Sequence, residues 1–310
     1  MENWDLIIIG AGPAGLTAGI YAGRSGLKTL ILEEKTSGGE AAVTPWIENY
    51  PGFENISGLA IVEKMVKHCK KFGAQINELE KVISLDFKGE KKFVKTDKAN
   101  YSASTLIIAA GTHYRLLNVP GEDKFQGRGV SYCALCDGAF FKGKKVIVVG
   151  GGNSAAMSAL YLSNIAANVK LAHRRNQLRA EEAVIDNLKR QNVDFFWNSE
   201  VKEIKGDNMV KSVILRNNKT EEISDVEIDG VFVQVGEVPN TKFVKEADVD
   251  VDKGGYIIVD ARQRTNISGV FAAGDVTNGP VKQIGTAVGQ AIVAATEAFG
   301  YVKRPYYYTG

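Results

Sequence analysis

Residues 6–15 read Leu-Ile-Ile-Ile-Gly-Ala-Gly-Pro-Ala-Gly, and this stretch decides the fold of the first part of the chain. The four apolar residues are typical of a parallel strand that is covered on both faces. The glycines follow in GxGxxG order, a helical pattern continues to about Ser25, and a second strand from Lys28 to Leu32 ends in Glu33. This order of strand, glycine turn, helix, strand and acid predicts a dinucleotide-binding unit of the Rossmann type.

Each glycine of this turn has its own physical role. We expect Gly10 to allow the tight turn, Gly12 to let the backbone approach a pyrophosphate, and Gly15 to let the helix pack closely on the strand. The helix N-terminus offers free N–H groups and the positive end of the helix dipole. Glu33 stands 23 residues after Gly10 and is placed to accept hydrogen bonds from adenosine ribose hydroxyls.

The uncharged stretch from Leu6 to Gly23 is also long enough for a membrane span or a signal segment. Its five glycines and Pro13, with no basic segment before it, favour a buried strand, a turn and a helix instead. With no other targeting segment, we expect a cytoplasmic protein.

The composition agrees with a folded protein: 45% of the residues are hydrophobic, and the formal charge is only +2, so nothing points to nucleic acid or an acidic membrane. Three cysteines exclude a disulfide scaffold and indicate a reducing compartment.

The same pattern returns 140 residues later. A strand at 146–149 leads into a GxGxxA turn at 150–155, a helix to about Asn164, and a strand at 168–172. At the offset of Glu33 this copy has His173, followed by Arg174, Arg175 and then Arg179. Guanidinium groups bind a 2′-phosphate, which a carboxylate would repel. The first unit therefore favours FAD or NAD and the second NADP(H), although the basic run is also compatible with a solvated face or a small nucleic-acid patch.

Cys133 and Cys136 form a CxxC pair just before the second strand–glycine turn. Two intervening residues let the sulfurs approach disulfide distance within one helical turn, and such pairs commonly have a lowered thiol pKa. Zinc would need two more ligands, and no remaining Cys or His has zinc spacing, so we expect no metal. Asp137 follows directly and is placed to exchange a proton with a thiolate, or to act as a helix N-cap or turn residue.

Near the C-terminus, a short strand from Gly269 runs into Gly274-Asp275, and a helix rich in small residues follows from about Gln283 to Phe299. Asp275 is suited to bind ribityl or ribose hydroxyls, and the helix N-terminus to stabilise a reduced flavin. Between the two glycine turns, Ser57 is expected to cap a helix to Phe72, and residues 75–102 to form a small accessory sheet.

Taken together and in this order, these motifs resemble the low-molecular-weight thioredoxin reductases, which are FAD-dependent pyridine nucleotide–disulfide oxidoreductases. The resemblance covers essentially the whole chain. It implies an α/β fold with two Rossmann-like, three-layer ββα dinucleotide-binding domains, the second inserted in the first. Residues 1–115 and 241–310 would bind FAD, and residues 116–240 would bind NADP(H) and carry the cysteine pair.

The resemblance also implies the cofactor-binding residues. Those for FAD would be Gly10, Gly12, Pro13, Ala14, Gly15, Glu33, Glu34, Gly38, Gly39, Glu40, Asn49, Val82, Ala110, Gly111, Gly274, Asp275, Lys282, Gln283 and Ile284. Those for NADPH would be Gly150, Gly152, Asn153, Ser154, Ala155, His173, Arg174, Arg175 and Arg179.

The implied reaction passes electrons from NADPH to FAD and then to the Cys133–Cys136 disulfide. Cys136 would take the electrons, Cys133 would exchange with thioredoxin, and Asp137 would act as acid and base. Because the cysteines and the nicotinamide share one domain yet must reach the same flavin, we expect residues 116–240 to rotate about linkers at 111–114 and 236–239. The family implies a homodimer.

Two positions differ from the family's usual residues: Asn153 stands for Asp and Met157 for Glu. An alternative is therefore a related flavoprotein with ferredoxin or a deazaflavin as electron donor, or with a peroxiredoxin-type partner. A thioredoxin reductase-like ferredoxin–NADP reductase has no use for the cysteine pair. An alternative from another functional class is a nucleotide- or redox-sensing binding protein that catalyses no reaction.

Overall fold

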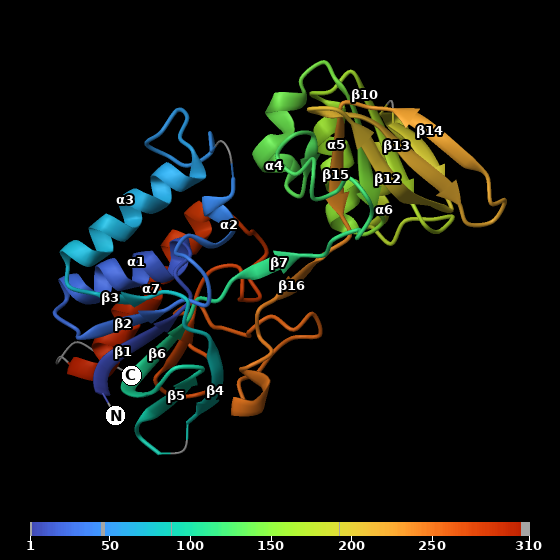
Figure 1. The fold of residues 1–310 in the computed structure, drawn as a ribbon. Helices are drawn as coiled ribbons and strands as arrows, with labels where there is room; N and C mark the ends of the chain where they lie inside the picture. Colours follow the sequence, from blue (N-terminus) through green and yellow to red (C-terminus); the bar gives the residue numbers. More distant parts are fainter. Residues whose placement is uncertain (1, 45–46, 88, 192, 305–310) are drawn as a thin grey trace. The chain divides into compact units, whose positions relative to one another are not determined.

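The computed structural model describes residues 2–44, 47–87, 89–191 and 193–304. The chain divides into two compact units (Figure 1). One, here called the terminal unit, comprises residues 1–113 and 238–310, and the other, the middle unit, comprises residues 114–237. Strands β7 (Thr112–Tyr114) and β16 (Glu237–Pro239) pair with each other where the chain passes from one unit to the other.

The terminal unit is built on five parallel strands in the order β3-β2-β1-β6-β17. Their bounds are β3 (Gln75–Asn77), β2 (Thr29–Leu32), β1 (Glu2–Ile9), β6 (Asn100–Ile108) and β17 (Val270–Ala272). The hairpin of β4 (Val82–Asp86) and β5 (Lys92–Thr96) pairs antiparallel with the first residues of β6, whereas β17 pairs with its last residues. Residues 75–102 therefore do not form the separate accessory sheet expected from the sequence, because β3 joins the parallel sheet and β6 is long enough to hold two partners along one edge.

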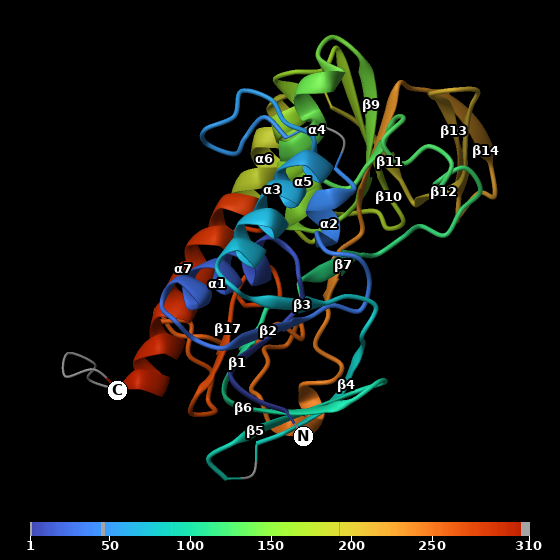
Figure 2. The ribbon, with the colours of Figure 1, turned by 60° about the vertical axis from the view of Figure 1, so that its left-hand side comes forward.

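The alternation of side chains along β1 gives this unit its three layers. Leu6 and Ile8 are buried against the helices α1 (Pro13–Arg24), α3 (Gly58–Lys71) and α7 (Ile284–Lys303). Ile7 and Ile9 point the other way, into a core shared with the β4–β5 hairpin and residues 244–257. Figures 1 and 2 show α1 and α7 lying alongside each other on the helical face.

The middle unit repeats this plan. Its parallel sheet has the order β11-β10-β9-β15-β8, with β11 (Val193–Trp197), β10 (Asn168–His173), β9 (Lys145–Gly150), β15 (Gly230–Gln234) and β8 (Val130–Ser131). Val146 and Val148 pack with the helices α5 (Asn153–Ser163) and α6 (Glu182–Arg190). Ile147 and Val149 pack on an antiparallel sheet of β12 (Ser199–Gly206), β13 (Val210–Asn217) and β14 (Ile223–Glu227). The predicted α/β fold with two three-layer ββα units is confirmed.

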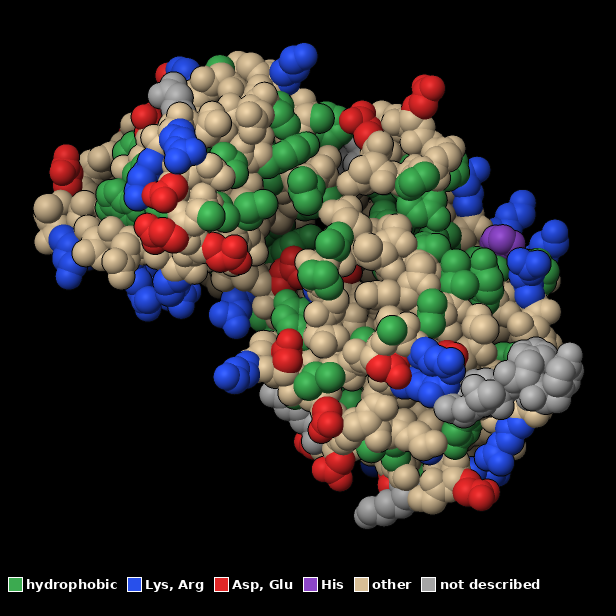
Figure 3. Space-filling model, turned by 180° about the vertical axis from the view of Figure 1, so that it is seen from behind, with side chains coloured by type: hydrophobic (Ala, Val, Ile, Leu, Met, Phe, Trp, Pro, Cys, Tyr) green, Lys and Arg blue, Asp and Glu red, His purple; other side chains and the backbone are tan. Residues whose placement is uncertain are grey.

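The shorter elements are α2 (Gly39–Ala42), α4 (Ala134–Asp137) and the 3₁₀ helices η1 (Gly138–Phe141) and η2 (Lys245–Ala247). As predicted, Ser57 caps α3, because its hydroxyl accepts a hydrogen bond from the N–H of Ala60 at 3.2 Å. The uncharged Leu6–Gly23 stretch is the end of β1, a turn and α1, and among the described helices none is long and apolar enough to cross a bilayer. On the face seen in Figure 3, basic and acidic side chains are interspersed.

Candidate functional site

The carboxyl ends of β1, β2, β6 and β17 lie at one edge of the terminal sheet because these strands are parallel. Ligands of open α/β sheets bind at this edge. Six of the residues predicted to bind the first cofactor come just after these four strands. They are Gly10 after β1, Glu33 after β2, Ala110 and Gly111 after β6, and Gly274 and Asp275 after β17.

The first glycine turn is closed toward the protein and open toward solvent. Gly10 has φ of +103°, and a Cβ there would lie 2.4 Å from the carbonyl oxygen of Ala109. A Cβ at Gly15 would lie 1.8 Å from the carbonyl oxygen of Gly10. At Gly12, in contrast, a Cβ would meet no atom within 4 Å. The space beside Gly12 is where a phosphate can approach the backbone at the start of α1, which begins with Pro13 and Ala14.

The carboxylate of Glu33 lies against this turn. Its Oε2 accepts a hydrogen bond from the N–H of Ala11 at 2.7 Å, and its Oε1 accepts one from the N–H of Lys35 at 2.9 Å. The carbonyl oxygen of Ala11 accepts a hydrogen bond from the N–H of Gly38 at 2.8 Å. The glycine turn, the predicted ribose-binding acid and the Gly38 loop therefore meet at one backbone position.

Other predicted residues surround this point. A Cβ at Gly39 would be 3.6 Å from the Cα of Gly12, and a Cβ at Gly274 would be 2.9 Å from the Cβ of Ala14. Burial raises the pKa of Glu40, while the charges of Lys35 and His113 act to lower it.

At the start of α7, the side chain of Gln283 caps the helix before Ile284 and accepts a hydrogen bond from the amide of Asn49 at 3.1 Å. Lys282 donates to the carbonyl oxygen of Asp275 at 2.9 Å.

Two predicted residues face elsewhere. Glu34 forms an ion pair with Lys81, and both side chains are about half exposed. The side chain of Val82 belongs to the core beneath the sheet. The structure thus brings most of the predicted set to one edge and assigns Glu34 and the Val82 side chain to structural contacts.

Sequence reasoning missed two residues that hold this edge. Asn240 donates from its side chain to the carbonyl oxygen of Ala110 at 2.8 Å, and its Oδ1 lies 2.8 Å from Nδ1 of His113. Gln290 of α7 accepts a hydrogen bond from the N–H of Gly274 at 2.8 Å. Single polar residues outside any motif carry no local pattern, so only their place in the fold identifies them.

The middle unit has the same kind of edge. The second glycine turn follows β9, the basic run follows β10, and the cysteine pair follows β8. The turn is again open at its second glycine position, since a Cβ at Gly152 would meet no atom within 4 Å. It is closed at Gly150, where a Cβ would be 2.3 Å from the carbonyl oxygen of Gln234, and it continues into α5 through Asn153, Ser154 and Ala155.

His173 lies beneath this turn. The imidazole is only 5% exposed, and a Cβ at Gly151 would lie 2.0 Å from its Cε1. Its Nε2 has no hydrogen-bond partner among the described residues. Burial lowers the pKa of His173, and the charges of Arg179, Arg174 and Arg175 lower it further. The ring therefore packs against the glycine turn as a neutral imidazole, and the cofactor contact expected of His173 stays a prediction.

The three arginines point outward. Arg174, Arg175 and Arg179 are exposed, and within the described ranges no carboxylate forms an ion pair with any of them. The N–H of Arg179 donates to the carbonyl oxygen of Gly151 at 2.7 Å, which ties this arginine to the glycine turn. Uncompensated guanidinium groups beside an open glycine turn suit an anionic ligand with a further phosphate.

The start of α5 is held by a reciprocal contact that the sequence did not indicate. The amide of Asn153 donates to a carboxylate oxygen of Glu181 at 3.1 Å and accepts from the N–H of Glu181 at 2.8 Å. Met157, one turn further along α5, is 53% exposed.

Cys133 and Cys136 are joined by a disulfide, with their Cα atoms 5.3 Å apart. The Sγ of Cys133 accepts a hydrogen bond from the N–H of Cys136 at 3.1 Å, so the pair spans the single turn of α4. Asp137 ends α4, and its side chain caps no helix. Burial raises the pKa of Asp137, against the lowering effect of a hydrogen bond from the Ser131 hydroxyl.

The third cysteine stands apart. Cys69 is fully buried between α3 and α1, and burial raises the pKa of its thiol to about 11. A thiol with this pKa is inert at neutral pH. In the described part of the chain no group of three or more His, Cys, Asp or Glu side chains is placed to hold a metal ion.

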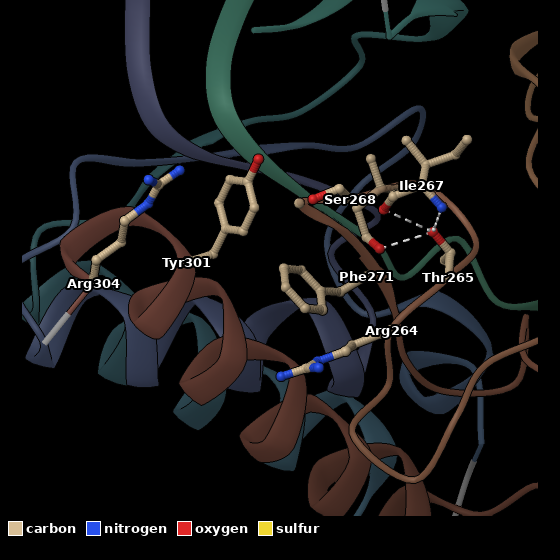
Figure 4. A pocket seen from close by; sticks show the side chains of 9 residues that line it. Arg264, Thr265, Ile267, Ser268, Phe271, Tyr301 and Arg304 are labelled. Carbon is tan, nitrogen blue, oxygen red and sulfur yellow. Dashed lines mark hydrogen bonds between the residues drawn. The ribbon is translucent and has the colours of Figure 1, made fainter. Parts of the chain in front are cut away.

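A cavity of about 360 Å³ in the terminal unit lies away from these residues (Figure 4). It is lined by Arg264, Phe271, Tyr301 and Arg304 among others, and Arg264 is already paired with Glu297 at 2.6 Å. The cavity lies at the amino end of β17, opposite the edge that carries Gly274, so it is not the dinucleotide site.

Comparisons with known proteins agree with this geometry. Residues 4–291 match the model of the pyridine nucleotide-disulphide oxidoreductase family. A thioredoxin reductase of Bacillus subtilis is 45% identical over 97% of this chain and 95% of its own length. A 34.2 kDa protein in the rubredoxin operon of Clostridium pasteurianum is 42% identical over 97% of this chain and 98% of its own. The crystal structure of thioredoxin reductase from Streptococcus pyogenes superposes with a TM-score of 0.93 at 44% identity, covering 98% of this chain and 99% of that one.

Proposed function

This chain belongs to the pyridine nucleotide-disulphide oxidoreductase family, and from that premise we propose that it is a thioredoxin reductase that uses FAD and NADPH. The observation that carries the proposal is the disulfide of Cys133 and Cys136, which lies at the same sheet edge as an open glycine turn and three unpaired arginines. The protein substrate is a thioredoxin or a thioredoxin-like protein, and the active form is a homodimer.

The terminal unit fits FAD. The free space beside Gly12 accepts a pyrophosphate, and Glu33 lies at the turn where the ribose hydroxyls would bind. Lys282 donates a hydrogen bond to the carbonyl oxygen of Asp275, and the N–H of the preceding residue, Gly274, donates one to Gln290. These two hydrogen bonds fix the loop after β17 at the same edge of the sheet. Bound there, FAD supplies the capacity to accept a hydride and pass on electrons, and the chain supplies position.

The middle unit fits NADPH. The space beside Gly152 accepts the pyrophosphate, and Arg174, Arg175 and Arg179 would hold the 2′-phosphate. His173 contributes by supporting Gly151 from below, since a neutral, buried imidazole adds no charge to the site. Because a carboxylate stands at the equivalent place in the terminal unit, the two sites discriminate between the two cofactors by charge.

In the reaction, the Cys133–Cys136 disulfide accepts two electrons and becomes a dithiol. Cys136 receives the electrons, Cys133 attacks the disulfide of thioredoxin, and Asp137 exchanges protons with the thiolates. Burial favours the protonated form of Asp137, which suits a group that must deliver a proton to a leaving thiolate. We further propose that residues 116–240 rotate about the linkers at 111–114 and 236–239, which include β7 and β16.

The decisive test is an anaerobic titration of the purified flavoprotein with NADPH and with NADH, read from the flavin absorbance. We expect NADPH to bleach the flavin at much lower concentration. Cys136→Ser should keep flavin reduction and lose thioredoxin reduction, whereas the control Cys69→Ala should keep both. Thioredoxin reduction by Cys136→Ser at the normal rate would contradict the assignment, and bleaching by neither nucleotide would favour ferredoxin or a deazaflavin as donor.

Rotation is tested by a disulfide or chemical cross-link between the terminal and middle units in the assembled flavoprotein. Turnover with thioredoxin should fall sharply and return when the link is cut. A cross-linked protein with unchanged turnover would refute the rotation and leave the cofactor assignments standing.

A further inference from the structure

The strand end before the cysteine pair is held in place from three sides. Ser131 is the last residue of β8, pairs with Phe232 of β15 and is 5% exposed. The next residue, Tyr132, is fixed twice: the side chain of Gln234 donates to its carbonyl oxygen at 2.7 Å, and its hydroxyl donates to the buried carboxylate of Glu122 at 3.0 Å. The Ser131 hydroxyl therefore belongs to a backbone segment that is held by these contacts, and the residue is buried.

This hydroxyl makes three contacts, all around the redox pair. The Oγ of Ser131 lies 2.6 Å from Oδ2 of Asp137, 3.3 Å from the carbonyl oxygen of Cys133, and 3.1 Å from the N–H of Cys133. A hydroxyl has one proton to donate and two lone pairs. It can therefore accept from the Cys133 N–H at all times, but it donates to only one of its two acceptors at once.

We propose that Ser131 is a positioning residue that holds the carboxyl of Asp137 in both of its protonation states. When Asp137 is ionised, the Ser131 proton points to Oδ2, at a distance typical of a charge-assisted O–H···O⁻ bond. When Asp137 is protonated, its O–H donates to Ser131, and the Ser131 proton turns to the carbonyl oxygen of Cys133. The Ser131 hydroxyl therefore keeps a hydrogen bond to Asp137 in both states, and the change from one state to the other needs only rotation of hydroxyl groups.

Among the side chains that the structure describes, the Ser131 hydroxyl is the hydrogen-bond partner of the Asp137 carboxyl. Burial raises the pKa of Asp137, and the Ser131 hydrogen bond lowers it. The neighbouring groups that can titrate are Tyr132 from the strand end, Tyr161 of α5, whose ring packs on Gly138, and, once the disulfide is reduced, Cys133 and Cys136. The hydroxyl of Tyr132 is engaged by Glu122.

The inference rests on the proposed function, in which two electrons from NADPH, relayed by the flavin, break the sulfur–sulfur bond and leave two thiolates. The O–H of Asp137 turns away from Ser131 and its proton passes to one thiolate, which becomes a thiol. The carboxylate that remains then accepts the hydrogen bond from Ser131. Ionisation of Asp137 is therefore stabilised at the moment when its proton leaves. Without the hydroxyl, the carboxylate would be buried with one donor fewer, and its proton would be released less readily.

The test is Ser131→Ala, with Ser131→Thr as the variant that keeps the hydroxyl. The titration of the Asp137 carboxyl is followed in the intact flavoprotein by difference infrared spectroscopy, with Asp137→Asn used to assign the band. We expect the titration to move to higher pH by about one unit in Ser131→Ala and to return toward the wild-type position in Ser131→Thr. The alkaline limb of the pH profile for thioredoxin reduction should move in the same direction, while flavin reduction by NADPH is unchanged.

Ser199→Ala is the matched control, because Ser199 is equally buried in the same unit and its hydroxyl donates only to a backbone carbonyl, that of Trp197 at 2.9 Å. It should shift neither measurement. An Asp137 titration in Ser131→Ala that coincides with wild type overturns the proposal. A wild-type pH profile in Asp137→Asn would instead overturn the proton-transfer role given to Asp137, and the infrared titration would still decide whether Ser131 holds its carboxyl.

Discussion

Gly12 and Gly15 stand three residues apart in one turn, yet their replacement by alanine should fail in opposite ways. At Gly15 a Cβ would be 1.8 Å from the carbonyl oxygen of Gly10, which is backbone and has no rotamer to relieve the clash. Overpacking of this kind costs about 1–3 kcal/mol or more. At Gly12 no atom lies within 4 Å of the added Cβ, and φ is −75°, which alanine adopts without strain.

We therefore expect Gly15→Ala to lower the free energy of unfolding of the FAD-free protein by about 2 kcal/mol. Gly12→Ala should change it by less than about 1 kcal/mol, the loss of a glycine at the helix N-cap included. Its methyl group would instead occupy the space assigned to the pyrophosphate. FAD affinity should then fall at least about tenfold, equivalent to about 1.4 kcal/mol.

Urea unfolding of the FAD-free proteins, followed by circular dichroism, gives the stabilities, and quenching of flavin fluorescence gives the FAD affinities. Gly289→Ala is the control, because it lies within α7 with no atom within 4 Å of an added Cβ. It should leave FAD binding unchanged and, if anything, stabilise the helix. If Gly12→Ala binds FAD as tightly as wild type, the open space beside Gly12 is not the pyrophosphate site, and the reasoning is refuted.

Three further perturbations follow from the site. Replacing Arg174, Arg175 and Arg179 together by Gln should weaken NADPH binding about 10- to 100-fold, since charge-assisted hydrogen bonds are lost. NADH binding and the free energy of unfolding should stay nearly unchanged. Equal losses of affinity for both nucleotides in a titration would contradict the 2′-phosphate assignment. Glu80 is 4% exposed and accepts hydrogen bonds from Thr96, Tyr101 and Asn77, so Glu80→Gln should cost about 1–3 kcal/mol in urea unfolding; an unchanged midpoint would show that the charge contributes nothing. After reduction and treatment with an alkylating reagent at pH 8, mass spectrometry should find Cys133 and Cys136 alkylated. Cys69 should stay unmodified until the protein is unfolded, because its buried thiol has a pKa of about 11. Rapid modification of Cys69 in the native protein would show that this helix opens readily.

Much of this protein follows from short-range patterns in the chain. The two strand–glycine turn–helix segments are predicted at 6–25 and 146–164, because a continuous apolar run and the steric needs of a tight turn act within about 20 residues. The pairing of Cys133 with Cys136 is equally local, since two intervening residues fix the separation of the sulfurs. The helix start at Ser57 needs only the residues beside it.

Other features depend on which segments the fold brings together. Asn240 reaches Ala110 only because the chain returns to the terminal unit after the middle unit, and Gln290 reaches Gly274 only because α7 returns to the sheet edge. His173 occupies the ribose-reading position of the sequence, but its ring is buried beneath Gly151. A side chain's partner across the fold is set by strand order, register and the path of distant segments, and none of these is encoded in the local periodicity. The sequence by itself therefore determined the two glycine turns and the cysteine pair. The tertiary structure decided which polar groups support them, because a hydrogen bond exists only between atoms that packing brings within about 3 Å of each other.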